Sequence, residues 1–222
     1  MSGLLALAAS LLLLGGDGTA ASTGAASAGS PAFDGTIRRI DAETRERMSG
    51  VSWHRGCPVG FADLRLLSVE HWGFDGEVRR GRLVVHREEA RPMLGVMRRL
   101  YRLRFPIRRM RLVDAYGADD RRSMAADNTS AFNCRFVAGT TRWSEHAYGR
   151  AIDVNPVENP YVTASGYVSP PAGAPFARRS RRAEGLIHGD GPVVRAFAEA
   201  GWEWGGDWAW PKDYQHFSAT GR

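Results

Sequence analysis

Apolar and polar residues along the chain first predict a β-hairpin. Residues 64–71 and 82–86 are typical of strands, and the segment between them, residues 73–76, ends in Asp-Gly, which favours a tight turn. We expect these two strands to pair with each other.

Apolar positions recur at helical spacing in residues 88–105, where Pro92 lies in the first turn and Phe105-Pro106 closes the helix. A shorter surface helix is expected at residues 41–48, and another at residues 192–200 with a proline near its start. The methionines and aromatics of the long helix are expected to lie in the core.

Further strands are predicted at residues 107–114 and 130–136. Residues 151–155 alternate apolar and polar side chains, so Ile152 and Val154 should face the core while Asp153 faces a cleft. Together these elements predict an α+β fold, a small antiparallel sheet with helices packed on one side.

A connection rich in Pro, Gly and Arg spans residues 156–182. It is longer than loops usually are in compact domains, which favours a functional flap or plain disorder. We expect a partly ordered flap over the cleft.

The N-terminal segment is typical of an export signal. Residues 4–14 form an apolar run too short to span a bilayer, and small residues dominate residues 20–30. The segment lacks Lys and Arg before this run, so a misplaced start and an uncleaved segment remain alternatives. We expect residues 1–32 to be an export signal and linker, and residues 33–222 to form one catalytic domain. The mature protein is expected to be exported and to have no stable membrane span.

The net charge of +6 comes almost wholly from arginine, since Lys212 is the only lysine. The paired arginines are scattered, and no nucleic-acid motif surrounds them. A solvated basic surface is therefore favoured over a nucleic-acid site, and such a surface suits an anionic polymer.

Cys57 and Cys134 are the only cysteines. An even pair in an exported protein predicts a disulfide, and two buried free thiols are the alternative. A metal site is less expected here, because neither cysteine has another Cys or a His at ligand spacing.

Candidate chemistry gathers in residues 144–155 and 213–217. His146 lies seven residues before Asp153, and Tyr148-Gly149 supplies a bend that can bring both side chains to one point; His216 then completes a possible site. Two imidazoles and one carboxylate form the ligand set of a catalytic zinc, and Asp213 is a further carboxylate suited to be the general base.

The pattern S-x-H-x-x-G-x-A-x-D, followed by W-x-W-G-G-x-W and D-x-x-H, resembles zinc peptidases of bacterial cell walls. These are the VanY-like D-alanyl-D-alanine carboxypeptidases and L-alanyl-D-glutamate endopeptidases. The resemblance runs from about residue 64 to residue 218. It implies a Hedgehog/DD-peptidase-like fold, zinc ligands at His146, Asp153 and His216, and a catalytic carboxylate at Asp213.

The resemblance also implies an arginine upstream of the first zinc histidine, which binds the substrate carboxylate or the oxyanion. The matching place, residues 114–117, has no arginine, so we expect Arg135 to take this role; a surface arginine is the alternative. Ser144 is expected to hydrogen-bond within the site. Four C-terminal tryptophans are candidates for a substrate-stacking wall, with at least half of them expected in the core: Trp202, Trp204, Trp208 and Trp210.

We therefore expect a monomeric zinc peptidase that hydrolyses an amide in the peptidoglycan stem peptide. The context of the C-terminal motifs is closer to the L-alanyl-D-glutamate endopeptidases, and a D-alanyl-D-alanine carboxypeptidase is the alternative. A wall-binding module with a structural zinc is a third hypothesis, although such a module has no use for a free carboxylate at Asp213.

Overall fold

The computed structural model describes Met1 and residues 32–221. The predicted export signal and linker therefore lie almost entirely outside the described residues. Within the described part of the chain, no helix is long and apolar enough to cross a membrane.

The largest sheet contains the predicted hairpin. Strands β2 (Leu64–Trp72) and β3 (Val78–His86) pair antiparallel from Leu64 opposite His86 to Trp72 opposite Val78, and β1 (Gly35–Arg39) adds on the other side of β2. At the turn, Gly76 has φ of 77°, a conformation that glycine adopts without steric cost. The predicted hairpin is confirmed.

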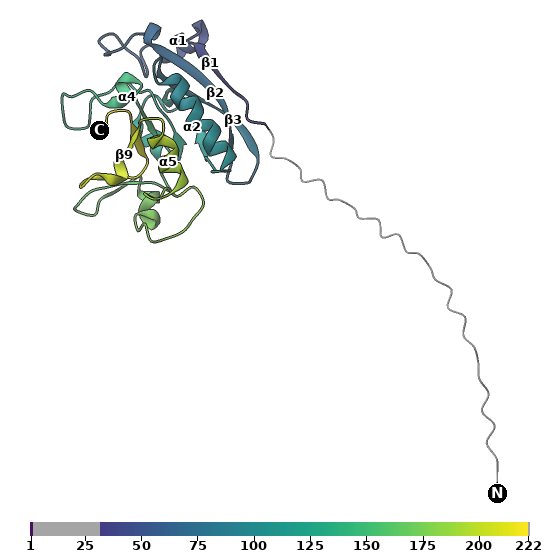
Figure 1. Cartoon of the computed structure of the whole chain (residues 1–222). Coiled ribbons are helices and arrows are strands. Elements are labelled where there is room, and N and C mark those ends of the chain that lie inside the picture. Colours follow the sequence, from purple (N-terminus) through teal and green to yellow (C-terminus); the bar gives the residue numbers. More distant parts are fainter. Residues whose placement is uncertain (2–31, 222) are drawn as a thin grey trace. The chain divides into compact units, whose positions relative to one another are not determined.

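Helix α2 (Ala90–Arg102) lies against this sheet and buries its apolar stripe, which includes Met93, Val96, Met97 and Leu100 (Figure 1). It is somewhat shorter than predicted. Helix α5 (Pro192–Ala198) packs beside α2, and α1 (Ala42–Met48) begins after Asp41, whose carboxylate accepts a 2.8 Å hydrogen bond from Thr44 N. All three predicted helices are confirmed.

A second sheet has the order β6–β11–β9, formed by β6 (Ala151–Asp153), β11 (His216–Ser218) and β9 (Glu203–Trp204). Ile152 and Phe217 lie opposite each other and are fully buried in the same core as the α2 residues. The core thus joins the two sheets through α2 and α5. The described chain is a mixture of small, mostly antiparallel sheets and packed helices, which confirms the predicted α+β class.

The remaining elements are short. The strands are β4 (Arg109–Met110), β5 (Asn128–Thr129), β7 (Tyr161–Val162), β8 (Val168–Ser169) and β10 (Lys212–Asp213). The helices are α3 (Asp120–Ala125) and α4 (Glu145–Tyr148), with 3-10 turns at Phe61–Asp63, Val113–Tyr116, Pro171–Phe176 and Gly205–Asp207.

Two predicted strands are largely wrong. Of residues 107–114, only β4 is a strand, and the segment then turns into a 3-10 helix. Residues 130–136 are extended but join no single ladder, because their amides bond to separate partners: Asp153 O, Val84 O, His146 O and Ser52 O. This segment crosses between neighbouring elements rather than running beside one of them.

The long connection at residues 156–182 contains ordered elements. It includes β7, β8 and a 3-10 helix, and β7 pairs antiparallel with β10, so that Tyr161 lies opposite Asp213. The connection expected to be a partly ordered flap is therefore folded, and it is hydrogen-bonded to the strand that carries Asp213.

Cys57 and Cys134 form a disulfide that connects positions 77 residues apart in the sequence. Both border a smaller apolar cluster with Met48, Leu66 and Phe132. The predicted disulfide is present, and it fixes the segment just before Arg135 to the N-terminal part of the domain.

Candidate metal centre

His146 projects from α4, a single helical turn. Ser144 precedes this turn, and its hydroxyl accepts a 3.3 Å hydrogen bond from His146 N, which satisfies one of the amides left free at a helix start. The turn ends at Gly149, where φ is 69° and a Cβ would lie only 2.6 Å from His86 N. The predicted bend is therefore present, and both its conformation and the close packing against β3 require glycine.

The ring orientation of His146 leaves one nitrogen with a lone pair. Its Nδ1 lies 2.6 Å from the carbonyl oxygen of Ala131, and because a carbonyl can only accept, Nδ1 carries the hydrogen. Nε2 of the neutral ring is then an acceptor, is buried and makes no hydrogen bond within the described structure. It faces Asp153 Oδ2, also an acceptor, at 3.3 Å.

Asp153 and His216 meet through strand register. They are directly opposite each other on β6 and β11, and Asp153 Oδ1 lies 3.1 Å from His216 Nδ1. The Asp153 carboxylate thus lies between the two imidazoles, whose ring centroids are 5.2 Å apart. One ligand atom from each of these three residues lies within 4.8 Å of the others, and all three residues are buried.

These features fit a bound cation. Burial alone would raise the pKa of Asp153, but positive charge on the adjacent His146 and His216 rings holds it well below its usual range. A cation bound among the three side chains would supply the same positive charge while His146 Nε2 keeps its lone pair. Facing acceptor atoms are unfavourable without a proton or a positive ion between them. A nitrogen, nitrogen and oxygen donor set of this size is suited to zinc.

Asp213 lies beside this group, on β10. Its Oδ1 is shielded from solvent and makes no hydrogen bond within the described structure. Burial raises the pKa of Asp213 to about 7; the charges of Asp153 and Asp120 also raise it, while His216 and Arg135 act in the opposite direction. A carboxyl with such a pKa can accept and return a proton near neutral pH.

Arg135 lies close enough to stabilise the ionised form of Asp213, although the strand expected to carry it is absent. Its backbone oxygen instead accepts a 3.1 Å hydrogen bond from Ser144 N, which ties it to the start of α4. The guanidinium pairs with Asp120 at 2.9 Å, and its buried Nε makes no hydrogen bond in the described structure. This arginine is therefore at the site's edge rather than on a remote surface.

Gly205 is a residue of the site that the sequence did not identify. A Cβ there would lie 2.6 Å from Asp213 O and 3.3 Å from His216 Cβ, so only glycine lets this chain segment pass so close. The Gly-Gly pair within W-x-W-G-G-x-W was the available signal. The next tryptophan, Trp208, places its ring 5.4 Å from that of His216.

Two of the four C-terminal tryptophans lie in the core, as expected. Trp202 and Trp204 are buried in the core, and Trp204 donates a 2.8 Å hydrogen bond to Tyr214 O, next to Asp213. Trp210 is 58% exposed and is the one with the most open ring.

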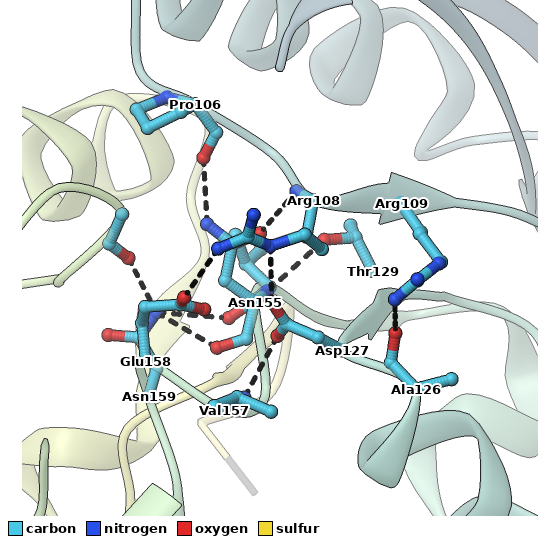
Figure 2. A network of polar contacts seen from close by, with 12 residues as sticks. Pro106, Arg108, Arg109, Ala126, Asp127, Thr129, Asn155, Val157, Glu158 and Asn159 are labelled. Atoms are coloured by element: carbon cyan, nitrogen blue, oxygen red, sulfur yellow. Dashed lines mark hydrogen bonds and ion pairs between the residues drawn. The ribbon is translucent and has the colours of Figure 1, made fainter. Parts of the chain in front are cut away.

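A polar network holds the chain just after β6 (Figure 2). Asn155 accepts a 3.1 Å hydrogen bond from Arg108 N and donates one of 2.7 Å to Pro106 O. Arg108 also pairs with Asp127 at 3.4 Å and with Glu158 at 3.3 Å. Burial, reinforced by the hydrogen bond and charge of Asp127, raises the pKa of Glu158 to about 7, against the opposing charge of Arg108.

His54, Cys57 and Cys134 form another group with ligand-type atoms close together, so the expectation that neither cysteine has a histidine near it was wrong. Both sulfurs are consumed in the disulfide, so no thiolate is available to bind a metal. The remaining histidines, His71, His86 and His188, belong to no such group in the described part of the chain.

Residues 138–219 match the family described as D-alanyl-D-alanine carboxypeptidase. This match confirms the predicted resemblance over residues 138–219, a shorter span than the one expected from about residue 64. The matched family is one of peptidases, and the matched region contains His146, Asp153, Asp213 and His216 but begins after Arg135. No curated protein and no solved structure matches the chain.

Proposed function

We propose that this peptidase hydrolyses an amide bond of the peptidoglycan stem peptide and that His146, Asp153 and His216 hold its zinc. The observation that carries the proposal is the convergence of three buried ligand atoms within 4.8 Å of one another. The unbonded lone pair of His146 Nε2 supports the assignment further.

A zinc ion held by these residues supplies Lewis acidity, which lowers the pKa of water and polarises a carbonyl group. Asp213 accepts the proton of the attacking water and returns it to the departing amine. Asp213 suits both transfers because it is buried beside the proposed ligands and its Oδ1 has no hydrogen-bond partner in the described structure.

Arg135 supplies the positive charge that a peptidase needs for a substrate carboxylate or for the developing oxyanion. Its pairing with Asp120 at 2.9 Å holds the guanidinium in position and leaves room to exchange that partner. Ser144 acts on the site indirectly, by fixing the start of the helical turn that carries His146.

For the bond that is cut, we favour the one between L-alanine and D-glutamate. The C-terminal motifs support this choice, since their W-G-G-x-W and D-Y-Q-H-F contexts are closer to the endopeptidase branch. D-alanyl-D-alanine carboxypeptidase activity is the second candidate, and the description of the matched family favours it. We further propose that the protein is exported and monomeric, and the disulfide supports export.

Defined muropeptides incubated with purified protein test the proposal, with mass spectrometry of the new termini. Endopeptidase activity produces a new D-glutamate amino terminus, whereas carboxypeptidase activity releases free D-alanine. A chelator should abolish cleavage and added zinc should restore it. Binding to wall material without any cleavage by the zinc-loaded protein would instead support the non-hydrolytic module.

A further inference from the structure

A groove lined by arginines lies between α2 and α5, which pack side by side (Figure 1). It has a volume of about 490 Å³ and continues into a second hollow of about 270 Å³. Five arginines and a single acidic residue line the two hollows: Arg91, Arg98, Arg99, Arg102, Arg195 and Glu199.

Small residues help to keep the groove open. Gly95 on α2 has open space where a Cβ would be, and Ala196 and Ala200 line the facing side. The arginines project around these residues and are exposed to solvent. The result is a concave surface with a positive rim, which concentrates its electrostatic potential.

Some of the arginines are already held in place. Arg99 pairs with Glu199 across the two helices, and the Arg98 guanidinium lies 5.5 Å from the centre of the Phe33 ring. Arg91 and Arg102 make no ion pair or side-chain hydrogen bond within residues 32–221. They are separated by about 16 Å along α2, at a rise of 1.5 Å per residue.

We propose that this groove binds a linear phosphodiester polymer of the cell wall. Guanidinium groups recognise phosphate oxygens in a bidentate manner, and a row of them along a helix suits an extended chain of repeated phosphates. The choice of a wall polymer rests on the proposed function, whereas the binding of a polyanion does not.

A membrane or a nucleic acid fits this surface less well. A flat bilayer cannot enter a concave groove, and no aromatic side chain lines either hollow to stack on nucleic-acid bases. A flexible polymer without bases needs only the phosphate contacts that the arginines offer.

Binding of fluorescently labelled poly(glycerol phosphate) to the full-length protein tests the proposal. In Arg91→Glu/Arg102→Glu the dissociation constant should rise about tenfold or more at low salt, because two phosphate contacts become repulsive. The control Arg39→Glu/Arg55→Glu changes the net charge equally at two exposed arginines outside the groove. It should change the constant less than about twofold, since screening weakens distant charges.

Filling the groove gives an independent variant. Gly95→Leu alters no charge but occupies the hollow, so it should also weaken binding of the polymer. If the charge-reversed protein does not fold, judged by its circular dichroism and melting temperature, Arg91→Gln/Arg102→Gln replaces it. Equal weakening by the groove pair and the control pair would overturn the proposal, because net charge alone would then explain binding.

Competition distinguishes the source of the phosphates. Phosphatidylglycerol vesicles or single-stranded RNA that displace the polymer at lower phosphate concentration would overturn the assignment to a wall polymer. Cleavage of small muropeptides should be unchanged in the groove variants, and Asp213→Asn should bind the polymer like the wild type. Failure of the groove proposal and failure of the proposed peptidase activity therefore give different results.

Discussion

The candidate metal centre and the arginine-lined groove are built in opposite ways. The centre collects buried side chains from short, irregular segments, each fixed by one or two specific hydrogen bonds. The groove lies on the exposed faces of two regular helices, where the arginine side chains are exposed to solvent and small residues leave space. Substitutions should therefore have large, local effects in the centre and smaller, salt-dependent effects in the groove.

The largest effect is expected from the proposed ligands. His146→Ala, Asp153→Ala and His216→Ala should each abolish stoichiometric zinc binding and peptidase activity, because one of three protein ligands is lost. Metal analysis of the purified variants measures this, with His188→Ala as the control histidine. Full zinc occupancy in all three variants would contradict the assignment.

Asp213→Asn separates the general base from the metal ligands. We expect zinc content near that of the wild type and a fall in kcat/KM of roughly 10²- to 10⁴-fold, the usual contribution of a positioned proton transfer. If Asp213 only orients His216, zinc affinity should fall instead, by roughly 10- to 100-fold. Zinc content and muropeptide cleavage measured on one preparation decide between these outcomes.

Glu158 should make stability depend on pH. The pKa of Glu158 is about 7 in the folded protein against 4.5 for the ordinary group. Its contribution to the free energy of unfolding is therefore fully present below about pH 4.5 and is lost as the pH rises through 7. The loss amounts to about 3 kcal/mol at most. Glu158→Gln should remove this dependence and be more stable than the wild type at pH 8.

Urea unfolding of Glu158→Gln at several pH values measures this effect. The exposed Glu77 provides the control, since Glu77→Gln should leave the pH profile unchanged. Identical profiles for the wild type and Glu158→Gln would show that the network of Figure 2 tolerates two ionised carboxylates.

The same glycine-to-alanine substitution can be made in the groove and beside the candidate metal centre. Gly95→Ala should raise the free energy of unfolding by up to about 1 kcal/mol, because the position is helical and open. Gly205→Ala should lower it by about 1–3 kcal/mol, because the new Cβ meets Asp213 O at 2.6 Å. Thermal melting and activity of both variants test this, and similar effects at the two positions would contradict the comparison.

The sequence predicted best those elements whose apolar spacing is regular over many residues. Helix α2 and the β2–β3 hairpin were expected near their observed bounds, and the spaced motifs indicated the residues that converge at the centre. Residues 130–136 were mispredicted because their extended backbone bonds to four different segments, and apolar content does not encode such partners. Four of the five groove arginines lie on α2 and only Arg195 comes from α5, so the sequence alone did not show that a second helix and small residues make a groove beside them.

The pairing of β7 with β10 determines how changes in the length of the connection at residues 156–182 affect the site. Asp153 and His216 are fixed by the register of β6 and β11, which tolerates no shift, whereas Asp213 is on a strand tied to the connection at residues 156–182. A change in the length of that connection can therefore adjust the position of Asp213 while leaving the spacing of Asp153 and His216 intact. If these residues have the roles proposed above, metal affinity and turnover can be altered separately.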